Sequence, residues 1–164
     1  MPERVVICNT SPLLYLHQVS KLELLAELYG EVTVPPAVES ELRAGQQRAI
    51  DVPMVSDIGW IHIRSPSAKN LPPSPVDLGV GAQVIALGLE LEGSLLVLDD
   101  RLARRVARVN GLPVTGTLGI LLRAKEAGFL TAIRPTLAQL QKTTMWLPEE
   151  LVHVVLAEAK ESID

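Results

Sequence analysis

Short runs of apolar residues alternate along the chain with longer stretches whose apolar positions recur at helical spacing. Uncharged apolar runs of this kind are typical of strands buried on both faces, as in parallel sheets. The strands are expected at residues 5–8, 32–34, 60–63, 95–98 and 113–114. Because strands and helices alternate, the pattern predicts an α/β fold in which right-handed crossovers place helices around a mainly parallel sheet.

Capping and helix-breaking residues set the expected helix bounds. Ser11 suits an N-cap position, Pro12 suits the first position of a helix, and Gly30 suits a C-terminus. The helices are expected at 12–17, 21–29, 37–44, 77–91, 101 to about 110, 120–127, 135–142 and from 148 onward. Residues 46–58 suggest a helix broken by Pro53, and 65–75 suggest a surface loop rich in proline and serine.

Composition narrows the class of protein. The 164 residues are expected to form one domain over 1–164, and a chain with 48% apolar but 3% aromatic residues builds its core from Leu, Val, Ile and Ala. One cysteine and three histidines exclude a disulfide framework and the familiar zinc spacings. We see no signal peptide and no run of about 18 apolar residues, so we expect a cytoplasmic chain without a membrane anchor. At a net charge of −4, nucleic-acid binding would require a local basic patch.

The strand at 95–98 leads directly into two aspartates, Asp99 and Asp100, at its carboxyl end. Open α/β sheets bind their ligands at this edge. The helix that follows carries arginines at helical spacing: Arg101, Arg104, Arg105 and Arg108. Carboxylates beside an arginine face suggest a divalent cation next to a phosphate-bearing substrate. Two plainer interpretations stay open: either aspartate is a good helix N-cap, and an arginine stripe is commonly a solvated face.

Other polar residues are expected at the same edge. Asn9 and Ser11 follow the first strand, Thr115 and Thr117 surround a turn at a helix start, and Glu41 projects from an early helix. Oxygen ligands without His or Cys favour Mg²⁺ or Mn²⁺, which can polarise a phosphodiester and activate water. Glu41 as a solvated carboxylate, and Ser11 and Thr117 as plain caps, remain the alternatives. No strand precedes the Gly-X-Gly at 79–81, so we reject a dinucleotide-binding motif there.

The chain resembles the PIN domain in sequence blocks that occur in the expected order. They are Asn9–Leu14, Pro35–Leu42, Leu78–Leu87, Leu96–Arg104 and Val114–Gly119. The resemblance covers about residues 5–142 and is closest to a poorly characterised prokaryotic branch near the toxin ribonucleases of toxin–antitoxin pairs. It implies a three-layer α/β/α sandwich and a Mg²⁺- or Mn²⁺-dependent endoribonuclease acting on RNA. It also implies a homodimer and a small antitoxin protein as partners.

The acidic positions of that family carry over only in part. Asn9 stands at the first acidic position and Ala82 at the third, whereas Glu41 matches the second and Asp100 the fourth, with Asp99 beside it. The resemblance therefore implies Asp100, Asp99, Glu41 and Asn9 as catalytic residues. The first three of these would be the metal ligands.

Hydroxyl and arginine side chains complete the predicted site. The residues expected to contact the substrate are Ser11, Thr115, Thr117, Arg101, Arg104 and Arg105. With two carboxylates replaced, one cation is more compatible with the chain than two. A catalytically impaired RNA-binding or protein-interaction module is the alternative, followed by an unrelated function such as a phosphoacceptor. The helix within 143–164 is expected either to pack on the core or to bind a second subunit.

Overall fold

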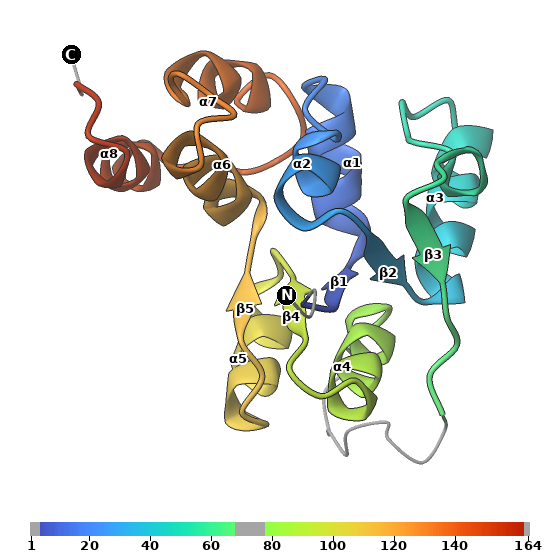
Figure 1. Cartoon of the computed structure of the whole chain (residues 1–164). Coiled ribbons are helices and arrows are strands. Elements are labelled where there is room, and N and C mark those ends of the chain that lie inside the picture. Colours follow the sequence, from blue (N-terminus) through green and yellow to red (C-terminus); the bar gives the residue numbers. More distant parts are fainter. Residues whose placement is uncertain (1–3, 68–77, 163–164) are drawn as a thin grey trace.

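The computed structural model describes residues 4–67 and 78–162. Their sheet is wholly parallel, with strand order β3-β2-β1-β4-β5 (Figure 1). The strands are β1 (Val6–Cys8), β2 (Val32–Val34), β3 (Ile61–Ile63), β4 (Leu95–Val97) and β5 (Val114–Thr115). β1 is the central strand, and β2 and β3 are added in turn on one side of it. The chain then crosses back, and β4 and β5 are added on the other side of β1. The direction of winding therefore reverses between β1 and β4, which is where open α/β sheets bind ligands.

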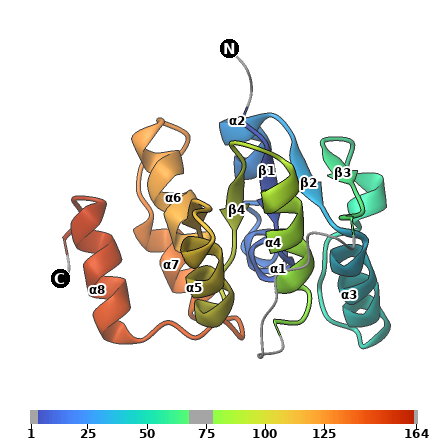
Figure 2. The same ribbon diagram turned by 90° about the horizontal axis from the view of Figure 1, so that it is seen from below.

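Helices cover both faces of this sheet, as the two ribbon views show (Figures 1 and 2). The helices are α1 (Thr10–Gln18), α2 (Leu24–Tyr29), α3 (Pro36–Gln47), α4 (Gly81–Glu90), α5 (Arg101–Val109), α6 (Thr117–Glu126), α7 (Arg134–Leu140) and α8 (Glu149–Glu158). α4 and α5 lie on one face, while α1, α2, α6 and α7 lie on the other. The predicted three-layer α/β/α sandwich is confirmed.

Alternation along the central strands divides the core into two apolar clusters. Ile7 and Leu96 point toward α4 and α5, whereas Val6, Cys8 and Val97 point toward the helices of the opposite face. These side chains are at most 1% exposed, which is why the runs contain no polar residue. The sheet is therefore buried on both sides, and its polar chemistry is confined to the strand ends.

Several local expectations differ from the structure. α1 begins at Thr10, so Ser11 lies inside the helix and does not cap it. α6 begins at Thr117, earlier than the expected residue 120. The segment 46–58 is not a helix broken by proline, because α3 ends at Gln47 and only a short 3-10 turn, Val55–Asp57, follows. Part of the expected proline-rich loop (68–75) and Asp77, the expected start of a helix, lie outside the described residues.

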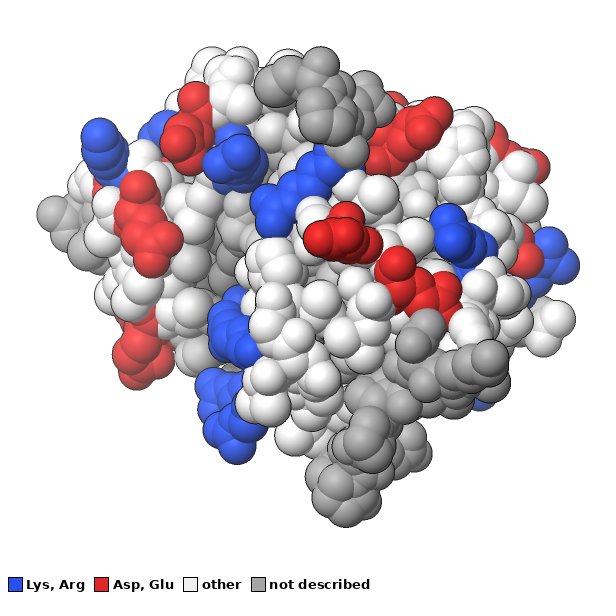
Figure 3. Space-filling view, turned by 60° about the horizontal axis from the view of Figure 1, so that its bottom comes forward, with Lys and Arg blue, Asp and Glu red and all other residues white. Residues whose placement is uncertain are grey.

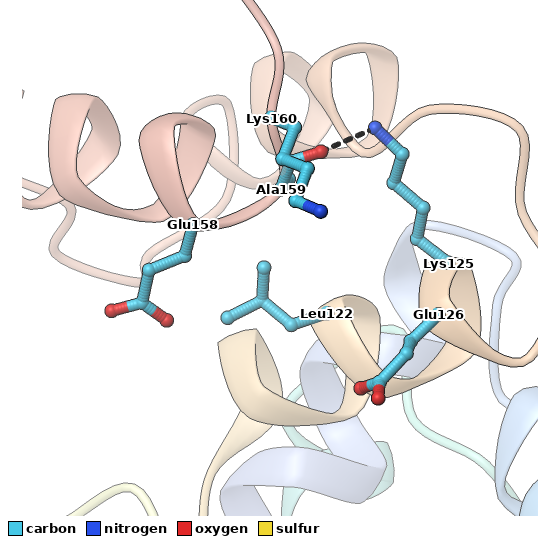
Figure 4. Close-up of a pocket in the computed structure, with 6 residues that line it drawn as sticks. All are labelled: Leu122, Lys125, Glu126, Glu158, Ala159 and Lys160. Atoms are coloured by element: carbon cyan, nitrogen blue, oxygen red, sulfur yellow. Dashed lines mark hydrogen bonds between the residues drawn. The ribbon is translucent and has the colours of Figure 1, made fainter.

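The C-terminal helix α8 is fastened to α6 and α7 by one lysine and one glutamate. Lys125 donates from Nζ to the carbonyl oxygen of Ala159 at 2.6 Å (Figure 4). It also donates to Glu161 at 3.0 Å. Glu161 also accepts the backbone N–H groups of Ile133 and Arg134. Burial acts to raise the pKa of Glu161, but these hydrogen bonds outweigh it and hold the pKa below its ordinary value. α8 thus packs on the body of the domain.

None of the helices within the described residues has the length and apolar character needed to cross a membrane.

Candidate active site at the carboxyl edge of the sheet

The ends of β1 and β4 meet at the point where the winding direction reverses. The N–H of Asn9 donates to the carbonyl oxygen of Val97 at 3.0 Å, which extends the pairing of the two strands by one residue. Asn9 then begins α1, and Asp99 and Asp100 lead into α5. The adjacency of two strands that are distant in sequence therefore places Asn9 beside the segment that carries the aspartates.

Asp99 links the end of β4 to the start of α6 through two hydrogen bonds to Thr117, which we call the Asp99 clamp. Its Oδ1 accepts the backbone N–H of Thr117 at 2.7 Å, and its Oδ2 accepts the Thr117 hydroxyl at 2.7 Å. A carboxylate at this position also offsets the positive end of the α6 dipole. Burial nevertheless raises the pKa of Asp99, although the two hydrogen bonds and the charge of Arg104 act in the opposite direction. Because both oxygens already accept a hydrogen bond, a cation at Asp99 would have to use their remaining lone pairs.

Gly116 makes this clamp sterically feasible. A Cβ at this position would come within 2.7 Å of both Asp99 Oδ1 and the Arg104 guanidinium. Arg104 in turn donates from Nη1 to the carbonyl oxygen of Leu98 at 2.9 Å. The glycine therefore lets the β5–α6 turn approach Asp99 and the Arg104 guanidinium closely.

Asp100 has a different role from its neighbour. It is the N-cap of α5, and its Oδ2 accepts the N–H of Ala103 at 2.8 Å. The capping interpretation is thus confirmed for Asp100. Its side chain is exposed, and within the described residues Oδ1 forms no hydrogen bond. Of the two aspartates, Asp100 is the one with an oxygen available to a ligand.

The side-chain oxygen of Asn9, Oδ1, is buried but accepts no hydrogen bond from the described residues. Asn9 is the N-cap of α1, yet its side chain makes no capping hydrogen bond. Buried polar atoms normally find a hydrogen bond, so the unsatisfied carbonyl oxygen of Asn9 is a candidate acceptor for an external donor or a cation.

The residue that faces Asn9 from α4 is Gly81. A Cβ built on Gly81 would lie 3.2 Å from the Ala103 Cβ and 3.9 Å from Asn9 Nδ2. Ala82, which the PIN-domain resemblance places at the third acidic position, is rotated by about 100° around the same helix. The packing of α4 against α5 puts Gly81 on the side of Asn9, which the sequence motif does not predict.

Glu41 lies on the exposed side of α3 and forms no ion pair or hydrogen bond within the described residues. One turn earlier, Ala37 lines a cavity of about 410 Å³ together with Ser40 and Gln83. No three His, Cys, Asp or Glu side chains of the described chain group closely enough to hold a metal ion. The predicted ligands Asp99, Asp100 and Glu41 therefore do not form a preassembled metal centre.

The arginine face lies beside these groups. Arg101, Arg105 and Arg108 are exposed, whereas Arg104 is half-buried against Asp99. Arg101 and Arg104 line a cavity of about 700 Å³, in which Thr115 also takes part. Figure 3 shows basic side chains beside a hollow on this side of the molecule. The predicted substrate contacts Arg101, Arg104 and Thr115 are thus brought together, while Thr117 is engaged with Asp99.

The chain belongs to the PIN-domain family, whose sequence pattern it matches over residues 5–161. This confirms the resemblance and extends it through α8, beyond residue 142. Membership gives the chain a nuclease-type fold, and PIN domains generally use divalent metals. No curated protein matches the chain significantly.

Proposed function

We propose that this PIN domain is an endoribonuclease that works with a single divalent cation, Mg²⁺ or Mn²⁺. The observation that supports this most directly is that Asp100 keeps an unbonded oxygen and Asn9 an unpartnered, buried Oδ1 at the carboxyl ends of two adjacent strands. Both are hard oxygen donors of the kind these cations prefer. Mg²⁺ needs only one or two protein carboxylates when water and substrate phosphates supply the rest, so the donor set fits one cation.

Each residue then has a defined task. Asp100 supplies the charge that holds the cation, Asn9 adds a neutral oxygen, and Glu41 is the carboxylate that α3 can add. When bound, the cation would polarise the scissile phosphodiester and lower the pKa of the attacking water. Arg101 binds the flanking phosphate, and the Asp99–Thr117 clamp holds the β5–α6 turn and Arg104 in place as positioning residues.

Asp100→Asn tests the proposal without destroying the fold. Asn is as good an N-cap as Asp, so α5 keeps its cap while the ligand charge is lost. We expect loss of Mn²⁺ binding by calorimetry and loss of cleavage of single-stranded RNA. Asp57→Asn, at an exposed aspartate of the 3-10 turn, is the matched control and should change neither. Equal cleavage by Asp100→Asn and the parent chain would refute the assignment.

A second candidate is an RNA-binding or protein-interaction module without catalysis. It is favoured by the engaged oxygens of Asp99 and by the lack of a carboxylate at Gly81 and Ala82. In this case the chain would bind RNA but cleave it in neither Mg²⁺ nor Mn²⁺, and Asp100→Asn would leave RNA affinity unchanged.

We further propose the cellular setting that the family resemblance implies, namely a cytoplasmic toxin that forms a homodimer and is neutralised by a small antitoxin protein. Growth arrest on induction of the parent chain, absent for Asp100→Asn, would support the toxin role. Normal growth at equal protein levels would count against it. Sedimentation of the purified chain tests the dimer.

A further inference from the structure

A groove separates the start of α5 from α8. One wall consists of the β4–α5 and β5–α6 turns, with Arg101 and Arg104. The other wall consists of the segment before α8 and the helix itself, with Met145, Trp146 and Leu151. The space between them measures about 700 Å³. Figure 2 shows that the chain enters α8 at the same end of the molecule at which α5 begins.

Trp146 contributes an exposed aromatic side chain to this groove. It is 81% exposed, although large aromatic residues normally bury most of their surface. Its neighbours are fixed: Met145 packs against the core, and the Thr144 hydroxyl lies 3.2 Å from that of Tyr15 on α1. Pro148 then forms the N-cap of α8. The indole therefore projects from an anchored segment.

The facing wall is basic. α5 contains four arginines and no acidic residue, in a chain whose net charge is −4. Arg101 is exposed in its first turn, and Arg104 lines the groove from the next turn. An apolar peptide would leave the Arg101 guanidinium without a partner. A nucleotide presents a phosphate to a cationic wall and a flat π-face to an aromatic one, so it matches both.

We propose that this groove binds an unpaired nucleotide of an RNA strand, with the base stacked on Trp146 and the phosphate held by Arg101. The inference rests on the proposed function, since it specifies how the same site receives its RNA. The groove includes Asp99 in its lining, and Asp100 follows directly in the chain. A strand anchored on Trp146 would therefore pass Asp99, the neighbour in sequence of the proposed ligand Asp100. Because a base inside a duplex cannot offer its face, this position requires an unpaired nucleotide.

The test measures the affinity of the chain for a short, fluorescein-labelled oligouridine by fluorescence anisotropy. EDTA is present so that no metal-dependent cleavage occurs. We expect Trp146→Ala to weaken binding by about 5- to 150-fold, the range for loss of one base–aromatic stack. Trp146→Phe should restore most of the affinity. Val109→Ala, which removes an apolar side chain that is also 81% exposed at the far end of α5, should change nothing.

Two further readouts separate stacking from a general effect on the surface. In Trp60→Phe, Trp146 is the only tryptophan, and its emission should be quenched by the oligonucleotide. Arg101→Gln should weaken binding. It should also reduce the magnitude of the slope of log K, the logarithm of the binding constant, against the logarithm of the salt concentration by about one, as expected for the loss of one phosphate contact. Arg48→Gln, at an exposed arginine just after α3, is its control.

The inference is overturned if Trp146→Ala and Val109→Ala bind alike, if the parent chain does not bind, or if duplex RNA competes as well as single strands. It is also overturned if Trp146→Ala dissociates a homodimer without changing RNA affinity, because the groove would then be a protein interface. Its failure is distinguishable from that of the proposed nuclease. Asp100→Asn should still bind the oligouridine in EDTA, and cleavage is measured separately with Mn²⁺.

Discussion

Removal of the Thr117 hydroxyl is the most direct test of the Asp99 clamp. Thr117→Val keeps the shape of the side chain but removes the 2.7 Å hydrogen bond to Asp99 Oδ2. Thr117 is fully buried, so no water replaces the lost donor. A hydrogen bond to a charged group is worth about 1.5–3 kcal/mol, and we expect a loss of about 2 kcal/mol in the free energy of unfolding. For a chain of this length that corresponds to roughly 4–8 °C in Tm.

The raised pKa of Asp99 also determines how the free energy of unfolding changes with pH. Burial raises the pKa of Asp99, so between its ordinary and its raised pKa the folded state binds more protons than the unfolded chain. Stability therefore falls as the pH rises through this window, and Asp99→Asn, which cannot ionise, should remove that fall. Thr117→Val should raise the pKa of Asp99 further, because a hydrogen bond to the ionised form is lost.

Urea unfolding from about pH 4 to pH 7 measures both effects. Thr131→Val, at an exposed threonine, is the control and should stay within about 0.5 kcal/mol of the parent chain. If Thr117→Val unfolds at the same urea concentration as this control, the clamp does not stabilise the fold. If Asp99→Asn and the parent chain show parallel pH profiles, the reasoning about the buried carboxylate is wrong.

Further predictions concern other parts of the structure. Gly119→Ala would place a Cβ against the Thr115 hydroxyl and should cost about 1–3 kcal/mol in urea unfolding, with Thr115→Ala relieving the loss in the double variant. Glu161→Gln should lower Tm at neutral pH and lose its effect in acid, because the stabilisation by a carboxylate of lowered pKa disappears as the pH falls through that pKa. Gly81→Glu should tighten Mn²⁺ binding in calorimetry more than Ala82→Glu, despite slight crowding by Ala103; equal affinities would show that position 81 does not face the site.

Much of the fold follows from local sequence signals. The apolar runs at 5–8 and 95–98 predict buried strands because a segment covered on both faces has no solvent side for polar residues. Alternation with amphipathic helices then leads to a parallel sheet. Asp100 is likewise recognisable as a cap from its place before a helix, since capping involves only neighbouring residues. Some errors, such as the start of α1, lie at element ends, where several residues compete for one role.

Only the tertiary structure determines which role each residue of the candidate site has. Asp99 and Asp100 are adjacent and chemically identical, and the sequence alone assigns both to one cation. Their roles diverge because β4 lies beside β5, which brings Thr117 to Asp99 while Asp100 turns into α5. The lack of a hydrogen-bond partner for Asn9 Oδ1 also depends on contacts between distant segments. The position of Gly81 beside Asn9 and Ala103 depends on such contacts as well. So does the exposure of Trp146. Sequence patterns encode local conformation and burial, but only packing determines which polar atoms remain available.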